Sequence, residues 1–285
     1  MKLTKQQFDI LEKACQNSIQ PALAENAQNE EELHGLIQDG IITDLGLEVL
    51  EQYRVKRAVF IAAGQGKRLA PITINTPKPL VRVHGVRIID RLIEACLKAD
   101  IQEIYIVRGY LGEQFDQLLY QYPMIRFLDN PLYREANNIS SALIARDILS
   151  GAYVFEADLL LYNPQIIRKY QYDSNFLAIK KEQTDDWCFR VRDNVIIEEQ
   201  VGGSGKDIWQ MVGISYWTEN DGINLSKDIQ TIYHAPGGQD RYWEQVPLVF
   251  CKNNYSVGIR ECQEQDIVEI DTFDELKAID KVYDI

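Results

Sequence analysis

Apolar residues occur in two alternating patterns over most of the chain. From residue 56 onward, short β-branched runs at 58–63, 104–107 and 153–158 are separated by stretches with helical spacing, such as 88–97. Strands that alternate with helices in this way are typical of a parallel sheet with helices on both faces. We therefore expect residues 56–285 to form an α/β domain with a Rossmann-like, mostly parallel sheet. The same patterns predict a further strand and further helices at 125–127, 112–119, 138–148, 223–232, 242–250 and 273–279.

The pattern changes in the middle of this region. Short alternating runs at 176–179, 189–191, 195–197 and 210–217 predict an antiparallel extension of the sheet. We expect this extension to lie over the ligand pocket of the domain. The glycine-rich segment 202–206 lies among them, but Asp207 follows its lysine and residue 200 is Gln, which excludes a P-loop. We interpret this segment as a flexible hairpin loop.

Residues 1–55 predict a small separate helical domain. Apolar residues at helical spacing predict a first helix near 3–14 and a second near 33–37, and the segment 41–50 predicts a third, capped by a Thr or Asp. The run 40–53 resembles the final helix region of winged-helix modules. However, these 55 residues hold 4 Lys/Arg against 10 Asp/Glu, and a DNA-reading helix needs the opposite balance. We interpret the domain as a packing or partner-binding appendage.

Composition excludes several classes of protein. A net charge of −13 argues against nucleic acid as a partner. The sequence has no run of eighteen apolar residues and no signal peptide, so we expect neither membrane spanning nor secretion. Five cysteines without a C-x-x-C pair predict reduced thiols in a cytoplasmic protein. The oligomeric state is not indicated.

The strongest chemical signal follows the first strand of the α/β region. Gly64 and Gly66 allow backbone N–H groups to form an anion-binding nest, and Lys67, Arg68 and Lys78 add positive charge. The spacing matches neither a P-loop nor a dinucleotide fingerprint. The segment therefore suits a polyphosphate.

Two aspartates are candidate metal ligands. Asp158 and Asp271 each follow an apolar strand, and ligands of open α/β sheets bind beyond the carboxyl ends of strands. Two carboxylates suffice for Mg²⁺, which keeps several waters and binds substrate phosphates. Each aspartate also has a structural interpretation, because Asp158 could close a turn and Asp271 precedes a capped helix start at Thr272.

The sequence resembles a known family at these positions. The signature Gly64-x-Gly66-x-Arg68-Leu69-x-Pro71-x-Thr73, followed by Pro77-Lys78-Pro79-Leu80, is similar to that of the nucleotidyltransferases that act on sugar phosphates or alcohol phosphates. Over roughly residues 56–280 the chain resembles in particular the bacterial choline-phosphate cytidylyltransferases. The motifs that carry this resemblance are Gly109–Phe115, Asn137-Asn138, Glu156-Ala157-Asp158, Asp186-Trp187, Tyr242-Trp243 and Glu269-Ile270-Asp271-Thr272.

The resemblance implies Mg²⁺-dependent transfer of a cytidylyl group from CTP to phosphocholine, giving CDP-choline and pyrophosphate. It places the metal on Asp158 and Asp271, and the triphosphate and transferred phosphate on Arg68 and Lys78. Nucleotide contacts are expected from Ala62, Ala63, Gly64, Gln65, Gly66, Lys67, Arg68, Gly109 and Asn138. The sequence departs from the family pattern at Ile139-Ser140, where an aromatic pair is expected. The choice of cytosine as the base therefore depends on the overall resemblance.

Aromatic residues flanked by acids predict the acceptor site. Trp209 and Trp217 flank an apolar strand and are expected in the core, whereas an exposed aromatic group beside a carboxylate suits a quaternary ammonium. The residues expected to bind the acceptor are Lys78, Asp186, Trp187, Asp240, Tyr242 and Trp243. Alternative acceptors are 2-aminoethylphosphonate or a sugar 1-phosphate, with CTP, UTP or dTTP as donor. An alternative of another class is a nucleotide-sensing regulatory protein.

Overall fold

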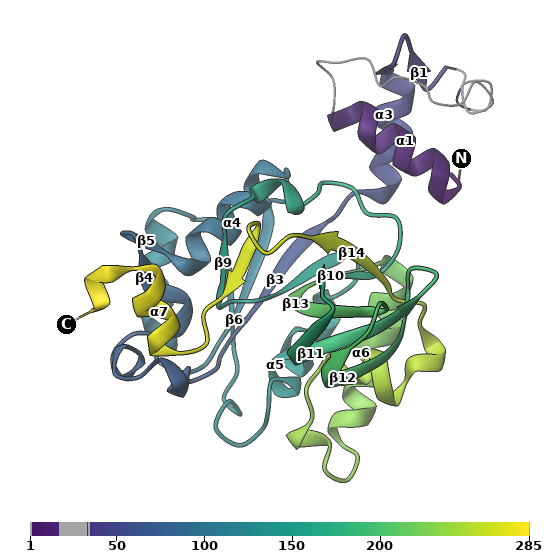
Figure 1. Ribbon diagram of the computed structural model, residues 1–285. Coiled ribbons are helices and arrows are strands. Elements are labelled where there is room, and N and C mark those ends of the chain that lie inside the picture. Colours follow the sequence, from purple (N-terminus) through teal and green to yellow (C-terminus); the bar gives the residue numbers. More distant parts are fainter. Residues whose placement is uncertain (1, 17–32, 34, 285) are drawn as a thin grey trace. The chain divides into compact units, whose positions relative to one another are not determined.

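The computed structural model describes residues 2–16, 33 and 35–284 (Figure 1). Its contacts divide the chain into two compact units. One unit comprises residues 1–55 and 169–172, and the other comprises residues 56–168 and 173–285. The predicted division into 1–55 and 56–285 did not assign the segment 169–172 to the smaller unit.

The larger unit is built on a nine-stranded sheet with the strand order β10-β14-β12-β11-β13-β8-β3-β6-β7. One half of this sheet is parallel, because β3 pairs in parallel with β6 and β8, and β6 pairs in parallel with β7. These strands are β3 (Arg57–Ala62), β6 (Glu103–Arg108), β7 (Arg126–Asp129) and β8 (Ala152–Glu156). The predicted α/β fold class is confirmed.

The other half of the sheet is mainly antiparallel, as the alternating runs predicted. β13 pairs with β8, the hairpin β11–β12 pairs with β13, and β10 lies between β13 and a parallel β14. The strands are β10 (Asn175–Lys180), β11 (Gln183–Arg192), β12 (Val195–Ser204), β13 (Ile208–Trp217) and β14 (Gly258–Cys262). In Figure 1 the hairpin β11–β12 lies in the lower right of the view.

The glycine-rich segment 202–206 is not the loop that the sequence predicted. Gly203 and Ser204 are paired with Thr184 and Gln183, so the strand β12 continues through the glycines and the connection to β13 is confined to 205–207. The pairing register shifts between Thr184 and Trp187. Glycines are compatible with such an irregularity because they lack the Cβ that restricts backbone angles.

Four α-helices belong to the larger unit, namely α4 (Ile88–Lys98), α5 (Ile139–Ala145), α6 (Glu219–Tyr233) and α7 (Phe273–Ile279). The predicted helices at 112–119 and 242–250 are instead a 3-10 helix, Gly112–Tyr120, and a π-helix, Val246–Phe250. Val59 and Phe60 point to opposite faces of β3 and both are fully buried, so both faces of this strand are covered. A large apolar cluster joins the sheet to α5 and α6.

Two short pairings complete the larger unit. β4 (Arg82–Val83) pairs with β5 (Val86–Arg87), and β9 (Leu159–Leu161) pairs antiparallel with β15 (Ile267–Glu269). The second pairing matters for function because it brings the end of the chain beside the residues that follow β8.

The smaller unit contains α1 (Lys5–Gln16), a hairpin of β1 (Ile37–Gln38) and β2 (Ile41–Ile42), and α3 (Asp44–Leu50). The first and third predicted helices are present, and Thr43 caps the third. The segment 33–37 is a turn that leads into β1 instead of a second helix, and residues 17–32 and 34 lie outside the described residues. Asp39 and Gly40 have positive φ angles, as a tight hairpin turn requires. No helix in the described part of the chain is both long and apolar enough to cross a membrane.

Candidate active site

The loop after β3 is held in shape by hydrogen bonds and by one glycine. Gly66 has a φ of 60°, and a Cβ there would lie 3.0 Å from the Cβ of Lys78, so glycine lets the loop pack against the lysine. The Thr73 hydroxyl donates to the Gly66 carbonyl at 2.8 Å. The Tyr110 hydroxyl donates to the Thr73 carbonyl at 2.8 Å, which links the loop to the turn after β6. The predicted phosphate loop is therefore held in shape by Thr73 of the loop and by Tyr110 from the turn after β6.

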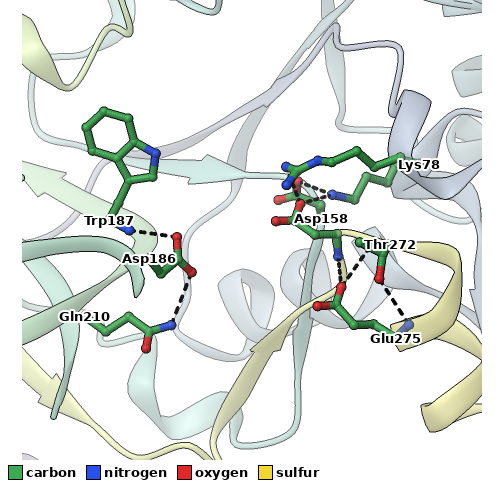
Figure 2. Close-up of polar contacts among 9 residues, drawn as sticks. Lys78, Asp158, Asp186, Trp187, Gln210, Thr272 and Glu275 are labelled. Carbon is green, nitrogen blue, oxygen red and sulfur yellow. Dashed lines mark hydrogen bonds and ion pairs between the residues drawn. The ribbon is translucent and has the colours of Figure 1, made fainter. Parts of the chain in front are cut away.

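Lys78 forms the centre of the site (Figure 2). Its Nζ lies 2.7 Å from Asp158 Oδ2 and 3.0 Å from Asp271 Oδ1, and the residue is 8% exposed. Arg68 Nη2 lies 2.7 Å from the same oxygen of Asp271. The structure thus brings together all four residues that the sequence predicted as catalytic, although Asp271 lies 193 positions after Lys78.

Asp271 reaches this position because β15 pairs with β9. The Ile270 N–H donates to the carbonyl of Asp158 at 3.2 Å, so the chain at 271 runs beside the residues after β8. Thr272 caps α7 in a capping box with Glu275, which also accepts the Asp271 N–H. Because Thr272 supplies the cap, the Asp271 carboxylate is not used in capping and is directed to Lys78 and Arg68.

A further group of carboxylates surrounds Asp158. Ligand oxygens of Glu156, Asp158 and Glu269 all lie within 4.8 Å of one another. Among the described residues, no group hydrogen-bonds Asp158 Oδ1, although this atom is buried. A buried carboxylate oxygen without a partner, next to two further carboxylates, fits the oxygen ligands that a hard divalent cation takes. The group contains Asp158 but not Asp271, the other predicted metal ligand, and it adds two glutamates that were not predicted.

The crowding of carboxylates affects their protonation. Burial, followed by the charges of Asp158 and Asp271, raises the pKa of Glu269 to about 8. Burial lowers the pKa of Lys78, but the carboxylates of Asp158 and Asp271 outweigh this and leave it raised. Lys78 is therefore a fixed positive charge.

An aromatic pair lies on another side of the site. The rings of Trp187 and Tyr242 are 5.4 Å apart in an edge-to-face arrangement. Asp186 accepts the backbone N–H of Trp187 at 2.7 Å, and it is near enough to Glu269 to contribute to that residue's raised pKa. In Figure 2, Asp186 and Trp187 lie to the left of the group formed by Lys78 and Asp158 and are separate from it. Two of the three predicted acceptor aromatics are thus paired near the carboxylates.

The third predicted aromatic, Trp243, does not lie at the surface. It is 2% exposed and packs against Phe176 and Trp217, so the expectation of an exposed aromatic group was wrong at this position. The chain turns between Tyr242, which is 41% exposed, and Trp243, which enters the core. Trp217 is fully buried as predicted, and Trp209 is partly buried with the Lys180 ammonium over its ring.

Three other predicted residues have different surroundings. The Asn138 side chain accepts the backbone N–H of Trp243 at 2.8 Å and donates to Glu244, so it holds the 242–244 segment in place. A Cβ on Gly109 would overlap the Tyr133 ring, and the backbone N–H of Tyr110 donates to the Ala63 carbonyl. Asp240 is exposed, and its backbone carbonyl accepts from Asn137.

Two glutamates of the candidate metal site, Glu156 and Glu269, had no role predicted from the sequence. Both lie in motifs that carry the family resemblance. For Glu156 and Glu269 the signal was available, because each lies two positions before a predicted metal ligand, and alternate residues of an extended segment share a face.

The chain is similar in sequence and in fold to known nucleotidyltransferases. Residues 57–147 match the nucleotidyl transferase family. A 2-aminoethylphosphonate cytidylyltransferase of Lancefieldella rimae is 35% identical over 233 residues, covering 79% of this chain and 92% of the relative. A choline-phosphate cytidylyltransferase of Streptococcus pneumoniae is 28% identical over 232 residues, covering 79% and 97%. The solved structure of a CTP:phosphocholine cytidylyltransferase from Streptococcus pneumoniae superimposes with a TM-score of 0.73 at 29% identity, covering 80% of this chain and 99% of that one.

Proposed function

Because this chain belongs to the nucleotidyl transferase family, we propose that it transfers a cytidylyl group from CTP to a small phosphoryl acceptor that carries an ammonium group. Choline phosphate, which the sequence predicted, and 2-aminoethylphosphonate are both acceptors of this class. The observation that supports the proposal most directly is the Lys78 ammonium held between Asp158 and Asp271 at the end of the glycine-rich loop. This arrangement combines a fixed cation with carboxylates at the place where the triphosphate would bind.

The chain's own residues contribute position and counter-charge. In-line attack of an acceptor oxygen on the α-phosphorus builds negative charge on the departing pyrophosphate, and oriented cations stabilise that charge. Lys78 is fixed by two ion pairs and stabilises the transferred phosphoryl group. Arg68, which is 69% exposed at its side chain, is free to move from Asp271 onto the triphosphate. The backbone N–H groups of 64–66 receive phosphate oxygens.

Mg²⁺ fits the carboxylates of the site. Asp158 and Asp271 would hold the ion, with Glu269 and Glu156 close enough to Asp158 to take part directly or through water. When bound, it would neutralise triphosphate charge and polarise the α-phosphate. It would also offset the mutual repulsion of these carboxylates.

The nucleotide and the acceptor would occupy neighbouring parts of the site. Ala62, Ala63 and Gly109 lie where β3 and β6 end, and this is the expected place for the nucleoside. We propose CTP as the donor, in place of UTP or dTTP, because the relatives named above are cytidylyltransferases. The aromatic pair Trp187–Tyr242 supports a cationic acceptor, since cations gain from contact with aromatic faces.

The test is a screen of pyrophosphate release with Mg²⁺. CTP, UTP, ATP, GTP and dTTP are each combined with choline phosphate, 2-aminoethylphosphonate, phosphoethanolamine and glucose 1-phosphate. We expect release with CTP and the ammonium-bearing acceptors, and at least about tenfold less with glucose 1-phosphate, which gains nothing from the aromatic pair. Preference for the sugar phosphate, or for UTP or dTTP, would contradict the proposal.

A further inference from the structure

The two rings of the aromatic pair are held in place by different means. Trp187 lies on β11, where it pairs with Val201 of β12, and the Asp186 carboxylate accepts its backbone N–H at 2.7 Å. Tyr242 lies outside the strands, in the segment between a 3-10 helix, Gly238–Asp240, and the π-helix. The position of its ring, 5.4 Å from the ring of Trp187, therefore depends on the contacts that hold this segment.

Asn138, at the start of α5, bonds the two residues that follow Tyr242. Its side-chain oxygen accepts the backbone N–H of Trp243 at 2.8 Å, and its side-chain nitrogen donates to the Glu244 carboxylate at 3.3 Å. Both ends of the amide are thus engaged within the protein. The side chain has the contacts of a clamp on the 242–244 segment and not those of a group that waits for a nucleotide.

A buried polar network fixes Asn138 in turn. The Asn130 amide donates to the hydroxyls of Ser140 and Ser141 at 2.9 and 3.0 Å, and the Ser140 hydroxyl donates to the Asn137 carbonyl at 2.8 Å. Asn130 and both serines are at most 2% exposed. A buried network in which each group has a partner is rigid. Ser140, where the sequence departs from the family pattern, thus helps to fix the start of α5.

A second contact between the same two segments comes from Asn137. Its backbone N–H donates to the Gln239 carbonyl at 2.8 Å, and its side-chain amide donates to the Asp240 carbonyl at 3.2 Å. The segment that carries Tyr242 is therefore bonded to the start of α5 on both sides of the tyrosine.

We propose that Asn138 is a positioning residue for the acceptor, acting through Tyr242, and that it does not contact the nucleotide. This inference rests on the proposed function and moves to the acceptor side a residue that the sequence predicted for the nucleotide. An ammonium group gains from an aromatic ring only when it lies over the face of that ring. Loss of the Asn138 amide would free the 242–244 segment and let the Tyr242 ring leave the orientation that the acceptor needs.

The first test is the variant Asn138→Ala, measured in steady state with CTP, Mg²⁺ and either choline phosphate or 2-aminoethylphosphonate. We expect the KM for the acceptor to rise by roughly three- to tenfold, and the KM for CTP to change less than about twofold. A rise in the KM for CTP as large as that for the acceptor would overturn the inference and leave the proposed function standing. Failure of the unmodified chain to transfer a cytidylyl group to either acceptor would overturn both.

The second test asks whether Asn138 acts through the tyrosine. If it does, the double variant Asn138→Ala with Tyr242→Ala should have the same KM for the acceptor as Tyr242→Ala alone, because the ring that Asn138 positions is already absent. Losses that add in the double variant would show a role independent of Tyr242 and would overturn the inference. A merely structural role of Asn138 would give such additive losses.

Asn254→Ala is the matched control. Asn254 is exposed, and its side-chain amide donates to Asp228 at 3.0 Å, so the variant removes a bond of the same kind elsewhere. Both KM values should stay unchanged in it. Thermal unfolding of each variant separates lost positioning from lost folding. If Asn138→Ala does not fold, Asn137→Ala takes its place and should raise the KM for the acceptor alone; an unchanged value would overturn the inference.

Discussion

Lys78 shows what one residue contributes to this site. Lys78 is buried, and its ammonium forms ion pairs with two aspartates from distant parts of the chain. The sequence predicted its role from the Pro-Lys-Pro-Leu motif. It did not predict that Asp158 and Asp271 share this one partner, because that depends on the β9–β15 pairing.

Replacing Lys78 tests its role in the reaction. Lys78→Ala should lower kcat by on the order of a hundredfold or more, as for the loss of one oriented charge that acts in the transition state. Steady-state kinetics with saturating CTP and acceptor measure this. A variant with normal kcat and only a raised KM would show that Lys78 merely binds substrate.

Trp243 and Glu244 show where reasoning from single residues fails. The sequence predicted Trp243 as exposed because an acid precedes the Tyr-Trp pair, yet Trp243 is in the core and Tyr242 is not. Adjacent residues in an irregular segment have no fixed period that assigns their faces. For the same reason the buried Glu244 could not be identified from sequence.

At the scale of elements, the turn after β6 holds the phosphate loop in place through hydrogen bonds. Besides the Tyr110 contact with Thr73, the Tyr110 hydroxyl lies 3.0 Å from the Ile74 carbonyl, and the Gln114 amide donates to the Asn75 carbonyl at 2.8 Å. These bonds fix the far side of the loop that contains Gly64 and Gly66. The turn therefore has a positioning role.

We expect Tyr110→Phe to loosen the loop. The KM for CTP should rise by roughly three- to tenfold, which corresponds to the loss of one hydrogen bond, while kcat changes less. Tyr120→Phe is the control, because Tyr120 lies at the end of the following 3-10 helix and is 95% exposed. An unchanged KM in Tyr110→Phe would contradict a positioning role.

β3 and α4 of the larger unit were predictable because each had a strong local signal. The β-branched run 58–63 became β3, and the amphipathic segment 88–97 became α4. The hairpin β1–β2 was missed because its apolar residues also fit helical spacing, although the pair Asp39-Gly40 is itself a hairpin signal. At this position the turn residues are a stronger signal than the periodicity.

At the scale of the molecule, the chain consists of a large unit that carries the site and a small unit that does not. Tyr170 and Tyr172 belong to the small unit, where Tyr172 stacks on Tyr53 at 5.4 Å and the Tyr170 hydroxyl donates to Glu51. No local pattern could place a segment from the middle of the chain with its beginning. The resemblance of residues 40–53 to winged-helix modules stays a prediction.

The acidic balance of residues 1–55 predicts that the small unit does not bind DNA. Fluorescence anisotropy of the full chain with labelled duplex DNA at low salt should show no binding up to about 10 µM, because the phosphate backbone repels an acidic surface. Binding that weakens as salt is added would contradict this interpretation of the appendage.

The central claim is that the chain joins the α-phosphate of CTP to the phosphoryl group of an ammonium-bearing acceptor. The most direct measurement is ³¹P NMR of a reaction with CTP, Mg²⁺ and phosphoethanolamine. We predict equal amounts of pyrophosphate and of a new product in which the α-phosphorus is coupled to the acceptor phosphorus, and we predict that Asp158→Asn forms neither. Hydrolysis of CTP to CMP without coupled product, or undiminished coupling in Asp158→Asn, would contradict the account.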